Sequence, residues 1–291
     1  MTGAGSGTNA YALIRQAMDK MIDTPLSIAV AGIAGRMGRQ LATAVVARGH
    51  RLVGGTERSG SPELVSDLAR FAGAEPPLGR TPDVDAAKAA HTASTWIDFT
   101  TPAATLAAMD ALRSTPVQTV IIGTTGFDAE AEAALQGHAD RFAIVKAGNF
   151  SLGVALLTAL ARLAAERLGA GWDAEILETH HRFKVDAPSG TALMLGDAVA
   201  AGRGAALPDL QAAPYCGPEA KREAGAIGFS VRRSGGVIGE HELTFTSETE
   251  TVRLAHSAID RSVFADGALA AAEWANGQPP GHYGIGDVLG V

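Results

Sequence analysis

The chain has 291 residues, a length that fits two domains of ordinary size. Hydrophobic residues make up 46% of it and charged residues 19%, a balance that excludes intrinsic disorder. The net charge of −7 argues against nucleic acid as a main partner, because phosphate binding draws on concentrated Lys and Arg.

Neither a membrane span nor a secretory signal is recognisable. No window approaches the ~18 uninterrupted apolar residues of a transmembrane helix. Residues 1–10 are rich in Gly, Ser and Thr and lack the basic start and apolar stretch of a signal peptide. The single cysteine, Cys216, cannot form an internal disulfide or a thiolate metal cluster. We therefore expect a soluble cytoplasmic protein.

The first half of the chain alternates short apolar runs with helical patterns. Residues 1–24 are expected to form an N-terminal extension, in which 11–22 could be a short helix. Helices are expected over 36–48, with Gly49 just past its end, and after Thr101-Pro102. Such alternation predicts right-handed βαβ crossovers and a parallel sheet. The predicted strands are 27–31, 51–55, 95–99, 117–122 and 142–145.

The pattern changes after Asn149. A long amphipathic helix is predicted over 151–168, ending at Gly169, and a final helix over 263–274. Between them, strand-like runs are separated by short turns, which predicts an antiparallel or mixed sheet and hence a second domain. These runs are 172–181, 226–233, 237–247 and 251–257.

A glycine-rich turn joins the first predicted strand to the first helix. It reads Gly32-Ile33-Ala34-Gly35-Arg36-Met37-Gly38. Glycines here allow a tight turn and close approach of the backbone to a pyrophosphate, which the N–H groups at the helix N-terminus can bind. An ordinary strand-to-helix turn is the alternative. Because Glu57 follows about 20 residues on, we favour a dinucleotide site.

Glu57-Arg58 bears on the choice of cofactor. An acid at this place can accept hydrogen bonds from both ribose hydroxyls and favours NAD, whereas an adjacent Arg can bind the 2′-phosphate of NADP. The presence of both predicts use of either cofactor. Two solvated loop charges are the alternative.

Polar and cationic residues are densest over 178–191. The two-residue period of a strand places Glu178 and His180 on one face and His181 on the other. A histidine is a suitable proton donor near neutral pH. Lys184 adds a positive charge for a carboxylate substrate.

Ser189-Gly190-Thr191 opens the next predicted helix, 192–200. Its hydroxyls and free N–H groups form a second potential anion site, although a Ser at that place is often only a helix cap. Metal binding is a weaker alternative, because the histidine pair lacks further ligands at zinc spacing. Nothing near Cys216 indicates a catalytic thiol. Four further polar residues belong either to the pocket or to a subunit interface: Arg232, Arg233, Glu240 and His241.

From Ile28 to its end the chain resembles the bacterial dihydrodipicolinate reductases. The motif that carries most of the resemblance is the Glu178–Thr191 stretch. The others are Val30–Gly38, Asp98-Phe99-Thr100, Ile122–Phe127, Gly148–Ser151, Arg261–Ala268 and Asp287-Val288-Leu289.

This resemblance implies a Rossmann-like dinucleotide-binding domain over 25–149 and a mixed α/β domain over 150–260 that binds substrate and builds a homotetramer. Residues 261–291 would return to the first domain. It further implies reduction of a cyclic dicarboxylate in lysine and diaminopimelate biosynthesis by NADH or NADPH. Trp96, Trp172 and Trp274 are expected in the core or at an interface.

The resemblance also implies roles for individual residues. His180 would donate the proton, assisted by Lys184. The substrate carboxylates would be held by His181, Lys184, Ser189, Gly190 and Thr191. The cofactor would be bound by Gly32, Ile33, Ala34, Gly35, Arg36, Met37, Glu57, Arg58, Gly123, Thr124, Thr125, Ala147, Gly148, Asn149 and Phe150.

The chain departs from the family pattern at Thr101, where a basic residue is frequent, at Gly148, and in the tail 283–287. Thr101 bears on the NADP contact. Two rival functions stay open: a related two-domain aldehyde or sugar dehydrogenase, and a catalytically silent NAD-binding sensor. A dehydrogenase that uses a thioester intermediate would need a placed cysteine, which Cys216 does not resemble.

Overall fold

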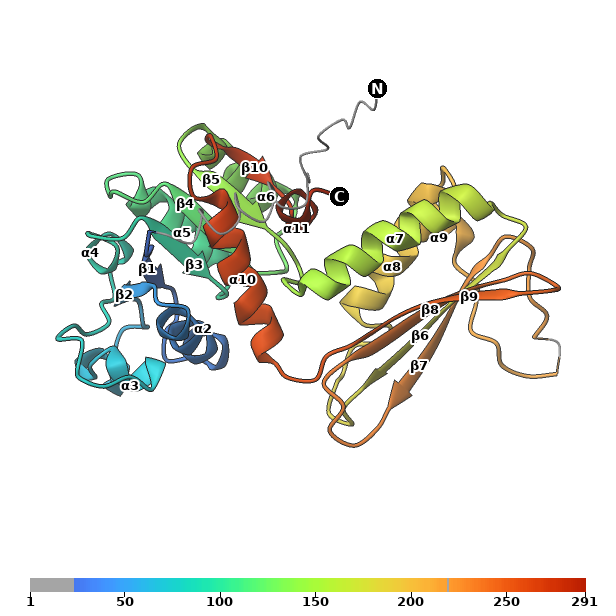
Figure 1. The fold of residues 1–291 in the computed structure, drawn as a ribbon, viewed down its shortest axis with the longest axis horizontal. Helices are drawn as coiled ribbons and strands as arrows, with labels where there is room; N and C mark the ends of the chain where they lie inside the picture. The colour runs from blue at the N-terminus through green and yellow to red at the C-terminus, as the bar shows by residue number, and fades with distance from the viewer. Residues whose placement is uncertain (1–23, 219) are drawn as a thin grey trace, which may run out of the picture. The chain divides into compact units, whose positions relative to one another are not determined.

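The computed structural model describes residues 24–218 and 220–291 (Figure 1). The helix expected over 11–22 lies outside the described residues. The chain divides into two compact units. The first runs to Ala147 and includes Ala268–Gly284, and the second comprises Gly148–Gly267 and Ile285–Val291.

The first unit is built on a six-stranded parallel sheet, ordered β10-β5-β4-β3-β1-β2. This confirms the predicted parallel α/β architecture. Five strands lie at or within a few residues of their predicted bounds. The strands are β1 (Ser27–Val30), β2 (Arg51–Gly55), β3 (Thr95–Asp98), β4 (Thr119–Ile122), β5 (Ala143–Lys146) and β10 (Gly281–Tyr283).

Helix ends in this unit follow the capping signals of the sequence. Helix α2 (Arg36–Ala47) is followed by Gly49 with a positive φ of 79°. The Thr101 hydroxyl accepts from the N–H of Ala104 at the start of α5 (Pro102–Leu112). The other helical segments are η1 (Pro62–Val65), α3 (Ala69–Ala72), α4 (Ala86–Ala89), α6 (Ala129–Gln136) and η2 (Gly137–Asp140).

Helices cover both faces of this sheet. On one face, Trp96, Met109 and Phe142 belong to a core cluster in which α4, α5 and α6 pack against the strands. On the other, α2 lies beside α10 (Ser262–Ala275), and Glu273 accepts from Arg48. The Trp96 ring is buried in this core, as expected.

The second unit contains a mixed sheet, ordered β7-β6-β8-β9. β6 runs parallel to β7 and antiparallel to β8, which in turn is antiparallel to β9. The helices α7 and α8 pack side by side and form a core with one face of the sheet (Figure 1). The bounds are α7 (Leu152–Leu168), β6 (Asp173–His180), α8 (Gly190–Gly202), α9 (Leu207–Leu210), β7 (Ile227–Arg233), β8 (Glu240–Thr246) and β9 (Thr251–Ser257).

The end of the chain differs from expectation. Residues 261–291 were expected to return as a whole to the dinucleotide-binding domain. Ala268–Gly284 does so and adds β10 to the sheet edge beside β5, but α11 (Ile285–Leu289) packs against α7 in the second unit. The chain passes from one unit to the other inside α10, between Gly267 and Ala268.

Gly38 allows α2 to pack closely on the turn that precedes it. A Cβ at Gly38 would lie 2.3 Å from the carbonyl oxygen of Gly32 and 2.6 Å from the Cα of Ile33. Both atoms belong to the backbone, so the turn itself would have to move. Packing of helix against turn thus depends on this glycine.

We expect Gly38→Ala to lower the free energy of unfolding by about 1–3 kcal/mol, the usual cost of overpacking. The matched control is Gly137→Ala. Gly137 has φ −59° and no heavy atom within 4 Å of its Cβ position, so alanine there should be neutral or slightly stabilising. Urea denaturation of both variants measures the difference. Equal stabilities would contradict the packing role of Gly38.

Candidate active site

The glycine-rich turn has the geometry of an anion site. Gly32 has φ +58°, and its N–H donates to the Thr56 hydroxyl at 3.3 Å. The N–H of Ile33 donates to the Thr56 carbonyl at 3.0 Å. Gly35 is the N-cap of α2 and offers no side chain to the first-turn N–H groups. These groups are therefore free to bind an anion.

The predicted loop residues differ in exposure. Ile33 is completely buried, whereas Gly35 and Arg36 are exposed and Ala34 and Met37 are half-buried. Since a pyrophosphate would contact the backbone of this loop, the exposed Gly35 lies where contact is needed. The buried Ile33, whose N–H already donates to the Thr56 carbonyl, supports the turn instead.

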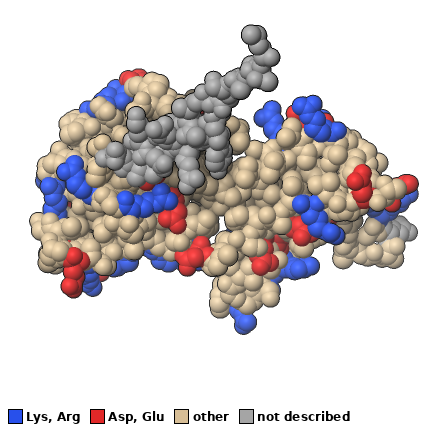
Figure 2. Space-filling model, viewed as in Figure 1, with Lys and Arg blue, Asp and Glu red and all other residues tan. Residues whose placement is uncertain are grey.

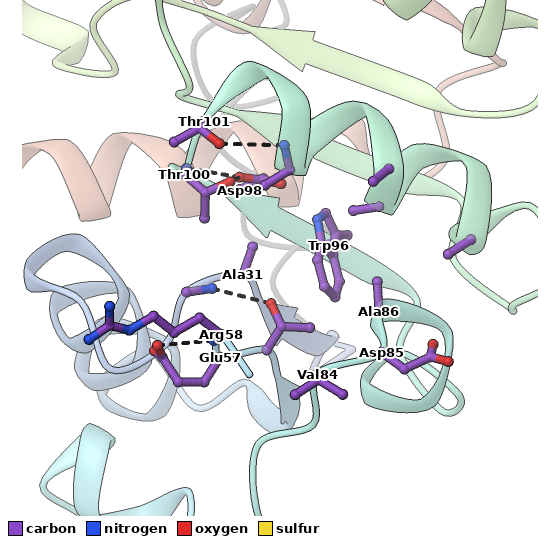
Figure 3. A pocket seen from close by; sticks show the side chains of 16 residues that line it. Ala31, Glu57, Arg58, Val84, Asp85, Ala86, Trp96, Asp98, Thr100 and Thr101 are labelled. Atoms are coloured by element: carbon purple, nitrogen blue, oxygen red, sulfur yellow. Dashed lines mark hydrogen bonds between the residues drawn. The ribbon is translucent and has the colours of Figure 1, made fainter. Parts of the chain in front are cut away.

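A pocket of about 660 Å³ lies beside this turn and is lined by Gly32, Glu57 and Arg58, among others (Figure 3). Glu57 and Arg58 lie together at one end, where the Glu57 carboxylate accepts from the N–H of Arg58 at 3.1 Å. The other lining residues include Trp96, Asp98, Thr100 and Thr101. The volume and the lining fit the adenosine half of a dinucleotide.

Gly123 and Thr124 have structural contacts of their own. A Cβ at Gly123 would lie 2.1 Å from the Phe99 ring, so glycine permits close packing there. The Thr124 hydroxyl accepts from the N–H of Thr100 at 3.0 Å and lies 3.3 Å from Asp98 Oδ1. The Thr124 side chain is thus committed to the fold. This loop can therefore contact a ligand through the exposed Thr125 and through its main-chain groups.

The remaining predicted cofactor residues are divided between the two units. Ala147 follows β5 in the first, and Gly148, Asn149 and Phe150 begin the second. The Asn149 amide donates to the Thr191 hydroxyl at 3.0 Å, which ties the start of α7 to the start of α8. Phe150 is buried.

A buried carboxylate, Glu178, is the centre of the polar cluster in the second unit. Its side chain is 1% exposed. Oε2 lies 2.6 Å from His180 Nδ1 and 2.8 Å from an Arg233 guanidinium nitrogen. Oε1 accepts from the other Arg233 nitrogen at 2.9 Å and from the N–H of Ser189 at 3.0 Å. Burial opposes the charged form, but the hydrogen bonds from Arg233 and His180 prevail and lower the pKa of Glu178.

Glu178 fixes the tautomer of His180. An ionised carboxylate can only accept, so Nδ1 carries a proton and donates it to Glu178. The other ring nitrogen, Nε2, is then the one that can exchange a proton with a substrate. Gly239 keeps space beside it, because a Cβ there would lie 3.1 Å from Nε2.

His180 is the last residue of β6, and His181 lies beyond the strand. As the strand period predicts, Glu178 and His180 lie on the helix-covered face, 1% and 9% exposed. The His181 ring packs beside Phe183, and its buried Nδ1 has no hydrogen-bond partner among the described residues. Of the two histidines, His180 is therefore the one that Glu178 holds, whereas His181 lies beyond the strand beside Phe183.

Ser189 is the N-cap of α8 and is 2% exposed. Its hydroxyl accepts from the N–H of Ala192, and Gly190 and Thr191 form the first turn. The Lys184 ammonium is paired with Asp186, 2.7 Å and 2.8 Å from its two carboxylate oxygens. The Lys184 hydrogen bond, which outweighs burial, lowers the pKa of Asp186.

His241 of β8 lies against this cluster. Its Nε2 is 3.1 Å from the Ser189 hydroxyl, and its ring stands edge-on to His180 with 5.1 Å between the centroids. Burial, followed by the repulsion of His180, lowers the pKa of His241 to about 4. His241 is therefore neutral over the physiological range.

The sequence marks Arg233 and His241 only as residues of the pocket or of a subunit interface, and it indicates no role for Glu178 or Gly239. For Glu178 a signal existed, since it shares a strand face with His180 two residues on. Arg233 and His241 meet Glu178 and Ser189 through the pairing of β6 with β7 and β8, from 55 and 52 residues away. No short-range sequence pattern predicts contacts that depend on strand pairing.

Over 24–218 and 220–291, no three His, Cys, Asp or Glu side chains are grouped so as to hold a metal ion. In the same ranges, no helix has the length and apolar character needed to cross a membrane.

Comparisons with known proteins agree with this architecture. Residues 26–150 match the family model "Dihydrodipicolinate reductase, N-terminus", and residues 153–289 match "Dihydrodipicolinate reductase, C-terminus". The 4-hydroxy-tetrahydrodipicolinate reductase of Parvibaculum lavamentivorans is 48% identical over 267 residues, covering 91% of this chain and 98% of its own. That of Dinoroseobacter shibae is 47% identical over 274 residues, covering 93% and 100%.

Solved structures support the fold. A dipicolinate-bound dihydrodipicolinate reductase from Paenisporosarcina superposes with a TM-score of 0.71 at 24% identity, covering 91% of this chain and 99% of its own. An amine dehydrogenase from Mycobacterium smegmatis gives a TM-score of 0.64 at 14% identity, covering 91% and 96%.

The first unit is Rossmann-like, and the mixed α/β unit that follows carries His180 hydrogen-bonded to Glu178. This combination defines a two-domain nicotinamide-dependent oxidoreductase. The chain belongs to the dihydrodipicolinate reductase family. The expected fold class and family are thereby confirmed, and the cofactor is NADH or NADPH.

The low pKa of His241 predicts acid sensitivity of the fold. Between pH 6.5 and about 4 the unfolded chain binds a proton at this histidine that the folded chain does not. The free energy of unfolding should therefore fall as the pH falls through this range, by at most about 3 kcal/mol from this group. In His241→Gln that contribution is missing. Urea denaturation should show a shallower loss of stability for the variant, and parallel losses would contradict the assignment.

Proposed function

We propose that the chain reduces 4-hydroxy-tetrahydrodipicolinate to tetrahydrodipicolinate in lysine and diaminopimelate biosynthesis, and that His180 supplies the proton. The family and the names of its close relatives support the substrate. The observation that carries the role of His180 is the 2.6 Å hydrogen bond between its Nδ1 and the buried Glu178.

Cofactor binding is assigned to the first unit and to the residues that follow it. Within the turn Gly32–Met37, the first-turn N–H groups of α2, which begin at Arg36, would hold the pyrophosphate. Glu57 and Arg58 would lie at the adenosine ribose, where the acid suits NADH and the cation suits the 2′-phosphate of NADPH. When bound, the cofactor supplies a hydride to the ring of the substrate.

The proton comes from the Nε2 side of His180. In the protonated ring, Nδ1–H is held by Glu178, so the Nε2 proton is the one that can be given up. The 4-hydroxyl of the substrate leaves as water, which gives the conjugated ring that accepts the hydride. The proton from His180 goes to the ring atom that gains electron density when hydride is added, which completes the two-electron reduction. The neutral ring that remains keeps its Nδ1–H on Glu178 and can be reprotonated at Nε2.

The two substrate carboxylates would be held by the loop that follows His180. The first-turn N–H groups at Gly190 and Thr191, the Ser189 hydroxyl and the Lys184 ammonium can all bind an anion. Lys184 is paired with the partly exposed Asp186, and a substrate carboxylate would compete with that partner. His181 completes the proposed set.

We also propose that the protein acts in the cytoplasm as a homotetramer assembled through the second unit. One face of its sheet is covered by α7 and α8, whereas the other carries Glu175, Leu177 and Arg232 around a shallow hollow. An uncovered sheet face of this kind is suited to pairing with another copy. Light scattering on the purified protein measures the mass, and a monomer would contradict the assembly.

The decisive assay mixes the protein with NADH or NADPH and the freshly made product of the preceding synthase step. Loss of reduced-nicotinamide absorbance that requires both protein and substrate is the expected result. Binding of the cofactor without its oxidation would instead favour a catalytically silent sensor. Parallel assays with the two cofactors give their relative use.

His180→Gln should reduce kcat by ~10²–10⁴-fold, the usual contribution of a positioned general acid. NADH affinity should change little, because His180 is not among the residues assigned to the cofactor. Initial rates and fluorescence titration with NADH measure the two quantities. A variant that turns over at nearly the rate of the unmodified protein would remove His180 from the proposed role.

A further inference from the structure

The hydroxyl of Ser189 takes part in two hydrogen bonds at the start of α8. Its oxygen accepts from the N–H of Ala192 at 3.2 Å and lies 3.1 Å from His241 Nε2. A serine hydroxyl has one hydrogen to donate and two lone pairs that accept. The N–H of Ala192 occupies one lone pair, so the direction of the bond to His241 decides where the hydrogen points.

The other nitrogen of His241 settles that direction. Nδ1 is buried and has no hydrogen-bond partner among the described residues. If Nε2 accepted from Ser189, the ring proton would sit on Nδ1 as a buried donor without an acceptor, an arrangement that native structures rarely contain. If Nε2 donates instead, Nδ1 keeps only an unpaired acceptor, which is tolerated more often. The second tautomer is therefore preferred.

The same arrangement occurs at the start of the neighbouring helix. His256 of β9 is paired in register with His241 of β8. Its Nε2 lies 3.2 Å from the hydroxyl of Ser151, the N-cap of α7, and its Nδ1 is likewise buried and without a partner in the described chain. Two adjacent strands thus each present a histidine to a helix-capping serine, and the same tautomer satisfies both sites.

We infer that His241 is a positioning residue that holds the Ser189 hydroxyl as a hydrogen-bond donor to a substrate carboxylate. With both lone pairs of Ser189 occupied by Ala192 and His241, its hydrogen remains to be donated. This inference rests on the proposed function, in which Ser189 binds the substrate. It adds that His241, on strand β8, sets the direction in which the Ser189 hydroxyl donates.

The surroundings of His241 keep it neutral and hence suited to this task. His180 and Glu178 face it from β6, His256 from β9 and Lys184 from the loop after β6. Burial and the neighbouring His180 hold the pKa of His241 near 4, so its tautomer persists from about pH 6 to 9. A charged His241 attracting the carboxylate directly would behave differently, because its effect would fade as the pH rises.

Titration calorimetry with dipicolinate tests the inference without requiring turnover. His241→Asn and His241→Gln form a matched pair: the Gln amide nitrogen reaches the position of Nε2, whereas the Asn amide ends one atom short. We expect His241→Asn to weaken dipicolinate binding about tenfold, as loss of one directed hydrogen bond to an anion does. His241→Gln should stay within about threefold of the unmodified protein. The Asn effect should be constant from pH 6 to 9.

A double-mutant cycle separates positioning from general damage. Ser189→Ala should weaken binding, and His241→Asn added to Ser189→Ala should cost less than about a further twofold. His256→Asn, which removes the equivalent bond at α7, is the structural control and should change dipicolinate affinity less than about twofold.

Several results would overturn the inference: equal affinities for the Gln and Asn variants, additive losses in the cycle, an equal loss in His256→Asn, or an Asn effect that fades with rising pH. Unchanged affinity in Ser189→Ala would remove the carboxylate contact and the inference together. If the unmodified protein neither binds dipicolinate nor oxidises NADH with the substrate, the proposed function itself fails.

Discussion

The candidate site depends on one buried carboxylate. Glu178 accepts four hydrogen bonds, from His180, from both nitrogens of the Arg233 fork and from the main chain of Ser189. Burying a carboxylate is costly unless it is paired and hydrogen-bonded, and here both conditions are met. The same interaction joins the end of β6 to the start of α8. The proposed proton donor and the proposed anion site therefore have one common support.

Local rather than global electrostatics must attract the ligands. The chain has a net charge of −7, yet the cofactor and a dicarboxylate substrate are anions. Acidic and basic side chains are interspersed over the viewed face of the molecule (Figure 2). Helix starts at Arg36 and Gly190, together with Arg58 and Lys184, provide positive groups where the anions are proposed to bind. Glycines near the proposed cofactor site serve close packing, since a Cβ at Gly38 would meet the backbone of Gly32 and one at Gly123 would meet the Phe99 ring.

Much of the fold could be predicted because its signals are local. β2 and β9 have their predicted bounds, and Thr101 and Ser189 cap helices as the sequence indicates. Ser151, expected as the first residue of a helix, is the N-cap of α7. The three-residue β10 is too short to show a period, and the return of α11 to α7 leaves no pattern at all.

The candidate site could be predicted only in part, again because only local signals can be recognised in a sequence. His180, Lys184 and Ser189 stand out because they share one short stretch of sequence. Arg233 and His241 do not, since strand pairing brings them from more than 50 residues away. The register of the sheet places the Arg233 cation beside Glu178, which holds the proposed donor His180. It also places the neutral His241 beside Ser189, the cap of α8.

The central claim is that Glu178 holds His180 with a proton on Nδ1, so that Nε2 is the nitrogen that exchanges a proton with the substrate. Nitrogen-15 NMR of histidine-labelled protein measures this directly, with His180→Gln used to assign the signal. The account predicts that the neutral His180 ring carries its proton on Nδ1 and that Glu178→Gln shifts it toward Nε2. A neutral ring protonated on Nε2 in the unmodified protein would contradict the account.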